Sequence, residues 1–214
     1  MDSSKDLFIL IAGANASGKT TVIKPRYVEG RVKHYLDPDR LLPVADVDIL
    51  SPKAREMYVQ NRPDRFAVRC MKDWLASPRI RSEGIATESN LVAYHDFNIL
   101  KTAKTAGMKT ELYFVGLPLE TALLRESIRS KNDEQEKINM EDIIQRYQKG
   151  LPNIQKHIAS GNVDVVMVYD NSRSRGEEQL LLHIGNGKFI KTAYFGGLDN
   201  VYIGNVMGAH CIKL

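Results

Sequence analysis

The sequence predicts an α/β protein built on a mainly parallel sheet that is flanked by helices. Short apolar runs alternate with segments of helical periodicity, which is typical of a parallel sheet whose strands are joined by helices. Acidic and turn residues follow several of these runs, and the ligands of such sheets bind at the carboxyl ends of the strands. The expected strands cover residues 7–12, 34–36, 84–87, 111–117 and 163–169.

Prolines and capping residues divide the helical segments. A break is expected near Pro63, and Pro25 indicates that the helix after the first strand is short or bent. Asn139 and Asp142 are spaced as a capping box, and Pro152 is expected to divide the helix that follows them. The expected helices cover residues 52–76, 92–106, 118–130 and a last segment that begins at residue 140.

The chain length of 214 residues fits one domain with a small appendage. We expect the main domain to cover residues 1–184. Residues 185–214 are rich in glycine between short β-prone runs, which predicts a hairpin tail packed on the same domain.

The composition narrows the class of protein and its location. The net charge is +4, but the basic residues are scattered, which does not favour a nucleic-acid partner. Two cysteines lie far apart without metal-site spacing. No apolar run reaches the length of a membrane span, and the first apolar run flows into a glycine loop, unlike a signal peptide. A cytoplasmic location without membrane contact is therefore expected.

One loop carries the strongest chemical signal. Residues 13–20 read GANASGKT and match the P-loop pattern G-x-x-x-x-G-K-[ST], between an apolar strand and a helix. The glycines let backbone N–H groups point at phosphate oxygens, Lys19 carries charge to the β- and γ-phosphates, and the Thr20 hydroxyl can ligate Mg²⁺. The plainer alternative is a chance glycine loop with a solvated lysine. The predicted fold is thus a P-loop NTPase fold, with a nucleotide bound by Gly13, Ala14, Asn15, Ala16, Ser17, Gly18, Lys19, Thr20 and Thr21.

Carboxylates at the ends of predicted strands are candidates for orienting or deprotonating a substrate hydroxyl. Asp39 follows the second strand and Glu88 follows the third. The alternatives are a helix cap for Asp39 and a carboxylate that complements a helix dipole for Glu88. Asp170 ends the last strand in a weakly Walker B-like context, where it either serves Mg²⁺ through water or caps the following turn.

Three arginines flank a charged segment at residues 131–137 that is predicted to be a mobile lid. Arg125 and Arg129 are spaced to share one helix face, and Arg146 follows the segment. An arginine over the phosphates stabilises charge that develops during phosphoryl transfer. The alternative for each arginine is ordinary surface charge.

These features together resemble the zeta-toxin family of P-loop kinases. The phosphate loop is followed by YLDPDRL, similar to the family's NPD segment, and by ATESN, similar to its E-T/S segment. The resemblance covers about residues 7–184, and its further matches are AKTAGMKTELYFVGL (103–117), Arg125, IIQRYQKGLPNI (143–154) and YDNS (169–172).

The resemblance implies an ATP-dependent kinase with Mg²⁺, because the studied toxins of this family phosphorylate UDP-N-acetylglucosamine on the sugar. It implies that Asp39 is the base, that Glu88 and Asn90 contact the substrate, and that Arg125 contacts phosphate. Family members often carry a Gly-Gly-His segment before the helix of Arg146, and this chain does not, so the lid arginine is left open between Arg129 and Arg146.

Two rival functions remain open at this stage. The acceptor in the first is a nucleoside, a polynucleotide end or another metabolite instead of a nucleotide sugar. The second rival is a nucleotide-binding regulatory module that is not a kinase. An antitoxin-like protein partner is compatible with the family, although no sequence feature indicates one.

Overall fold

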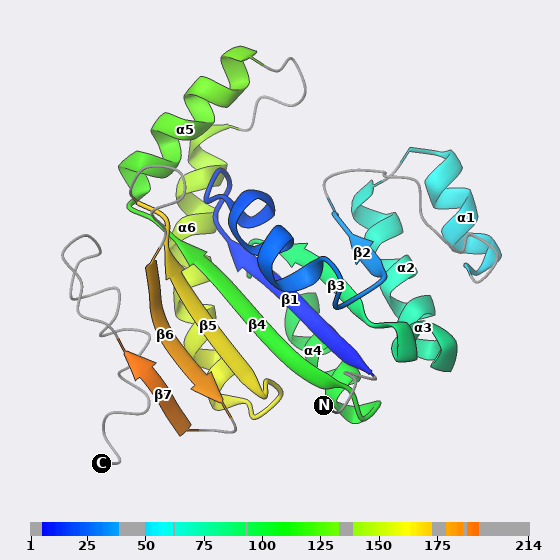
Figure 1. The fold of residues 1–214 in the computed structure, drawn as a ribbon. Helices are drawn as coiled ribbons and strands as arrows, with labels where there is room; N and C mark the ends of the chain where they lie inside the picture. The colour runs from blue at the N-terminus through cyan, green and yellow to red at the C-terminus, as the bar shows by residue number, and fades with distance from the viewer. Residues whose placement is uncertain are drawn as a thin grey trace.

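The computed structural model describes residues 6–38, 50–61, 63–92, 94–132, 139–172, 179–185 and 188–192 (Figure 1). The described strands form one seven-stranded sheet in the order β2-β3-β1-β4-β5-β6-β7. The first five strands of that order are parallel, and β6 and β7 add to the edge as an antiparallel hairpin. The strands are β1 (Leu7–Gly13), β2 (His34–Leu36), β3 (Ile85–Ser89), β4 (Lys109–Gly116), β5 (Val165–Asp170), β6 (Gln179–Gly185) and β7 (Lys188–Thr192).

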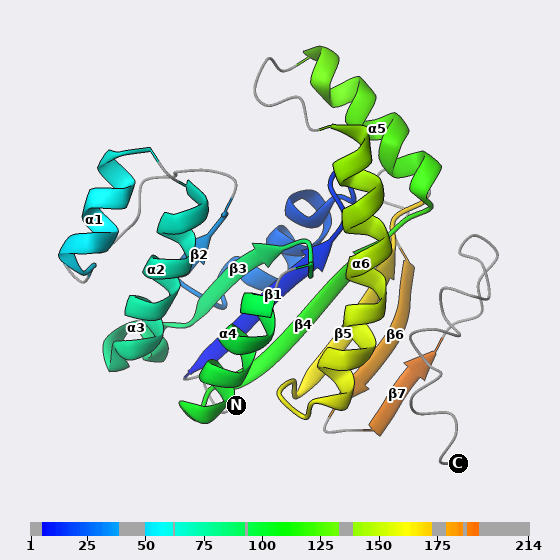
Figure 2. The same ribbon diagram turned by 180° about the vertical axis from the view of Figure 1, so that it is seen from behind.

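Helices cover both faces of the sheet. In Figures 1 and 2, η1 lies on one face, α4 and α6 lie on the other, and α5 projects beyond the carboxyl ends of the central strands. The helices are η1 (Lys19–Val28), α1 (Pro52–Val59), α2 (Pro63–Ala76), α3 (Pro78–Glu83), α4 (Tyr94–Thr105), α5 (Leu119–Asn132) and α6 (Met140–Ala159). The predicted α/β fold is therefore confirmed.

The apolar run of β1 is buried from both sides, which explains why it lacks the alternation of a half-exposed strand. Phe8 and Leu10 belong to the core that packs under α2, α4 and α6. Ile9 and Ile11 point to the opposite face, where they pack with Ile23 of η1. Because β1 is buried on both faces, it fixes the position of Gly13, where the glycine loop leaves the sheet.

The segment just after η1 is tied to β4 by a charge cluster around the buried Glu111. Arg31 lies 2.9 Å from Glu111 Oε2 in an ion pair and donates a 3.0 Å hydrogen bond to the hydroxyl of Tyr113. Burial works against the charged form of Glu111, but hydrogen bonds from Arg31, Lys109 and Tyr113 hold the pKa of that carboxyl below its usual value. The helix that follows the glycine loop is thus anchored at its far end as well as at its start.

Several details differ from the sequence-based expectation. The strand β3 runs to Ser89, so Glu88 lies inside the strand and not after it. A short helix that the pattern did not predict, α3, begins with Pro78 after the Ser77 cap, whose hydroxyl accepts from the Ile80 N–H. Residues 131 and 132 are the last residues of α5, and the remainder of the expected lid lies outside the described residues.

The expectation that Pro152 divides the last helix was wrong. The helix α6 runs without interruption from Met140 to Ala159, and Pro152 is inside it. A proline in a helix interior removes one backbone hydrogen bond, but Ile143 and Ile154 of α6 are fully buried. Packing of that apolar face holds the helix together despite the lost bond.

Much of the glycine-rich tail is outside the described residues, which end at residue 192. Within the described part, β6 and β7 form the hairpin at the sheet edge. The division of the chain after residue 184 stays a prediction.

We expect Pro152→Ala to stabilise the protein. The exposed position already has helical backbone, and alanine restores the N–H donor and removes the ring, so the free energy of unfolding should rise by about 1–3 kcal/mol. Urea unfolding followed by circular dichroism measures the change. A lower unfolding midpoint in this variant would contradict the prediction.

Candidate functional site

The loop between β1 and η1 curls tightly enough to require glycine at both ends. Gly13 has φ +149° and Gly18 has φ +93°. A Cβ atom on Gly13 would lie 2.4 Å from the carbonyl oxygen of Val115, and one on Gly18 would lie 2.4 Å from Nδ2 of Asn171. Both glycines of the motif are therefore fixed by close approach of neighbouring chain, as well as by backbone conformation.

Asn171 supports this loop from the end of β5. Its side-chain Nδ2 donates a 2.8 Å hydrogen bond to the carbonyl oxygen of Ser17, and its backbone N–H donates to Gly116. Asn171 and Ser17 are both buried. Sequence reasoning gave Asn171 no role of its own, although it lies in the YDNS segment, because nothing in the pattern connects that segment to the loop.

The amine of Lys19 lies at the mouth of the loop. Its Nζ donates to the carbonyl oxygens of Gly13 at 2.9 Å and Ala14 at 3.1 Å, and it lies 3.4 Å from Oδ1 of Asn90. The ammonium thus lies between the loop and the end of β3. The curled loop, the start of η1 and this charge together fit an anionic phosphate chain.

Thr20 begins η1 and contacts a buried carboxylate of the adjacent strand. Its hydroxyl donates a 2.9 Å hydrogen bond to Oε1 of Glu88, and the Tyr35 hydroxyl donates to the same oxygen. Glu88 is only 8% exposed. Burial, and then the negative charge of Glu88, raise the pKa of Tyr35, so the phenol keeps its proton. The amine of Lys24 lies 4.3 Å from the centre of the Tyr35 ring in a cation–π contact.

The three arginines that the sequence predicts near the phosphates make different contacts. Arg146 of α6 donates a 3.2 Å hydrogen bond from Nη1 to Oδ1 of Asn15, so α6 contacts the loop directly. Arg129 instead pairs with Glu126 of its own helix at 2.7 Å. Arg125 lies half-buried on α5. The structure thus brings Arg146 to the phosphate loop and pairs Arg129 within α5.

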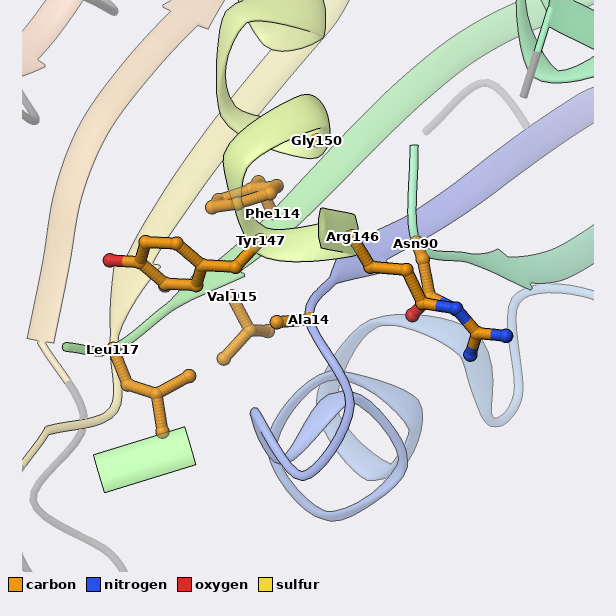
Figure 3. Close-up of a pocket in the computed structure, with 9 residues that line it drawn as sticks. Ala14, Asn90, Phe114, Val115, Leu117, Arg146, Tyr147 and Gly150 are labelled. Atoms are coloured by element: carbon orange, nitrogen blue, oxygen red, sulfur yellow. The ribbon is translucent and has the colours of Figure 1, made fainter. Parts of the chain in front are cut away.

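A mostly apolar pocket lies beside the loop, between the end of β4 and α6 (Figure 3). Phe114, Leu117 and Tyr147 supply apolar walls. Asn90 and Arg146 lie next to each other at its loop-facing side (Figure 3). The loop-facing side of the pocket thus carries two polar groups beside an otherwise mostly apolar lining.

Two of the predicted carboxylates have different outcomes. Asp39 lies outside the described residues, so its role as base stays a prediction. Asp170 is buried at the end of β5, and its Oδ1 accepts a 2.8 Å hydrogen bond from the Ser172 N–H. This contact matches the turn-capping alternative for Asp170. Within the described part of the chain, no group of three or more His, Cys, Asp or Glu side chains is placed to hold a metal ion.

Comparison with known proteins identifies the class. The fold and the loop define a P-loop protein with a second polar site at the neighbouring strand end. The family model described as zeta toxin matches residues 1–180, and the chain belongs to the zeta-toxin family. Among curated proteins, none matches the sequence significantly.

Solved structures support the same fold. The complex of AvrRxo1-ORF1 with AvrRxo1-ORF2, determined with ATP, includes a chain 16% identical to this one with a TM-score of 0.63; the match covers 88% of this chain and 61% of that one. A structure from the PezAT chromosomal toxin–antitoxin system of Streptococcus pneumoniae is 14% identical with a TM-score of 0.60, and the match covers 99% of this chain and 87% of that one. This chain therefore spans about three fifths of the matched AvrRxo1 chain. Of the helices that the structure describes, none combines the length and apolarity needed to cross a membrane.

We expect Asn171→Ala to weaken the loop. The Ser17 carbonyl would be left buried without its donor, so the free energy of unfolding should fall by about 1–3 kcal/mol. ATP affinity, measured by calorimetry, should fall as well, because the loop backbone that faces the phosphates loses its support.

The control is Thr110→Val, which removes the hydroxyl contacts to Asn162 and Asp164 at the start of β4, at the opposite end of the strand from the loop. That variant should lose stability and keep its ATP affinity. Equal ATP affinity in Asn171→Ala and wild type would contradict a supporting role for Asn171.

Proposed function

We propose that this chain is an ATP-dependent kinase that transfers the γ-phosphoryl group of ATP to a hydroxyl of a small-molecule substrate. One observation carries the proposal. The Lys19 amine contacts the loop carbonyls and, across the site, Asn90 at the end of β3. A triphosphate on the loop would then have its γ-phosphate next to the strand end where a second substrate can be held.

The nucleotide is bound by the loop of residues 13–21 in this proposal. Backbone N–H groups and the start of η1 hold the phosphates, and Lys19 neutralises the β- and γ-phosphates. The Thr20 hydroxyl fits as one ligand of Mg²⁺, an ion that in such sites takes few protein oxygens and completes its shell with phosphate oxygens and water. When bound, the ion would neutralise charge on the transferring phosphate. The ATP-bound AvrRxo1 structure of the same fold supports ATP as the nucleotide.

The arginines complete the charge stabilisation. Arg146 contacts the loop through Asn15, which favours Arg146 over Arg129 as the arginine that closes over the phosphates. Arg125 retains the phosphate contact that the family resemblance implies. In phosphoryl transfer the protein itself takes little part in making or breaking bonds. Catalysis therefore depends on positioning the substrates and on stabilising charge.

The acceptor is held on the β2–β3 side of the loop. Asp39 orients or deprotonates the attacking hydroxyl, and Asn90 contacts the acceptor. A nucleotide sugar is our first candidate, and UDP-N-acetylglucosamine is the member of that class to test first. The similar structures are a two-protein complex and a toxin–antitoxin system, which supports an antitoxin-like protein partner for this chain.

A product screen tests the function. The protein is incubated with ATP and Mg²⁺ and with panels of nucleotide sugars, nucleosides and polynucleotide ends, and products are identified by mass. We expect ADP release to accelerate with one acceptor class and a product heavier by one phosphoryl group. ADP release that no acceptor accelerates would favour the regulatory module over the kinase.

Lys19→Ala should weaken ATP binding by about 10- to 100-fold, the equivalent of one lost charge-assisted contact, and should abolish transfer. Calorimetry and the ADP assay measure the two effects. The control is Lys33→Ala, which removes an exposed lysine that pairs with Glu83 away from the loop. ATP affinity that is equal in the two variants would exclude the phosphate contact of Lys19.

Asp39→Asn should keep ATP binding and lose transfer by about 10²–10⁴-fold, the range of a lost general base. Single-turnover transfer to the identified acceptor measures the loss, and calorimetry confirms binding. Transfer at the wild-type rate would exclude Asp39 as the base.

A further inference from the structure

Glu88 faces the nucleotide loop. The two hydrogen bonds that the structure gives its carboxylate both fall on Oε1, one from Thr20 and one from Tyr35. Within the part of the chain that the structure describes, both of these donors therefore share one oxygen of the carboxylate. The carboxylate is nearly buried. It is held by Thr20, the P-loop residue that is expected to ligate Mg²⁺.

The sheet order explains why this carboxylate, and not Asp170, reaches Thr20. The strand β3 pairs directly with β1, and its register sets Glu88 beside Ile11. Adjacent parallel residues point to the same face, and Ile11 packs on the face covered by η1. Asp170 ends β5, two strands from β1 and thus roughly 10 Å away in the sheet. Its carboxylate is also engaged with the Ser172 N–H.

The direction of the Thr20 bond has a chemical consequence. The hydroxyl gives its proton to Glu88, so its oxygen keeps the lone pairs with which it could ligate a cation beside the loop. In P-loop NTPases the cation is held by the loop Ser/Thr together with a strand-end carboxylate. Glu88 stands where such a carboxylate is needed, one strand from the loop strand.

We propose that Glu88 serves the metal ion of the nucleotide: it orients the Thr20 hydroxyl as a Mg²⁺ ligand and accepts a hydrogen bond from metal-bound water. This inference rests on the proposed binding of ATP with Mg²⁺. It moves Glu88 from the acceptor side, where the family resemblance places it, to the nucleotide side. Asn90 and Asp39 are then left to contact the acceptor.

Tyr35 is the positioning residue of this arrangement. Its hydroxyl donates to the same oxygen as Thr20, and its ring is packed under the Lys24 amine. Two donors on Oε1, from Thr20 and from Tyr35, hold the carboxylate in place beside the start of η1. Tyr35 acts on the metal only through Glu88.

The experiment measures ATP binding without any acceptor. Calorimetry gives the ATP dissociation constant in excess Mg²⁺ and in EDTA, for the wild type and each variant, and the ratio of the two is the metal-dependent gain. We expect Glu88→Gln to lose about 10- to 100-fold of this gain, the range for residues that orient metal ligands, and to keep its affinity in EDTA. Tyr35→Phe should lose a smaller part of the gain, again without change in EDTA.

Two further variants make the result decisive. Thr20→Val should lose the gain as Glu88→Gln does, which tests the same contact from its other end if Glu88→Gln fails to fold. Asp170→Asn, a strand-end carboxylate away from the loop threonine, should keep the full gain. Thermal unfolding of each variant confirms that the protein is folded.

The outcomes separate this inference from the function on which it rests. A full metal-dependent gain in Glu88→Gln, or its loss in Asp170→Asn alone, overturns the inference while ATP binding stands. A wild type that binds ATP equally in Mg²⁺ and EDTA also overturns it. A wild type that binds no ATP in either condition overturns the proposed function and, with it, this inference.

Discussion

The pairing of β1 with its two parallel neighbours is the constraint on which the site depends. On one side, the carbonyl of Val115 in β4 approaches Gly13 so closely that only glycine fits. On the other side, β3 sets Glu88 against the first residues of η1. The loop is therefore shaped by β4 and β5 and is chemically completed by β3. A shift of one residue in the β1–β3 register would turn Glu88 to the opposite face and remove its contact with Thr20.

The charges around the loop are arranged in two groups of opposite sign. Lys19 and Arg146 approach the loop from its open side and end on carbonyl and amide oxygens that a phosphate chain would outcompete. Glu88 approaches from β3, and the donors that reach it among the described residues are the hydroxyls of Thr20 and Tyr35. The cationic groups and the carboxylate therefore contact the loop region through different atoms: Lys19 through the carbonyls of Gly13 and Ala14, and Glu88 through the hydroxyl of Thr20.

Local patterns in the sequence predicted most of the fold and the centre of the site. The apolar runs predicted the five parallel strands. The motif predicted the loop because its glycines are required by the local backbone conformation there. The contacts between distant segments were not predictable in this way. Neither the support of Ser17 by Asn171 nor the pairing of Thr20 with Glu88 leaves a periodic signal, since each joins residues more than 60 positions apart. Pro152 was misjudged because its local cost was weighed without the buried face of α6.

The contact between Gly150 and the turn after β3 bears on how the two halves of the site can move. A Cβ atom at Gly150 would lie 2.7 Å from the carbonyl oxygen of Asn90, so the α6 backbone touches the turn with no side chain between them. The helix that carries Arg146 and the turn that carries Asn90 are thus in direct backbone contact. Any side chain at position 150 would therefore push the turn of Asn90 and the helix of Arg146 apart and change the distance between these two polar groups.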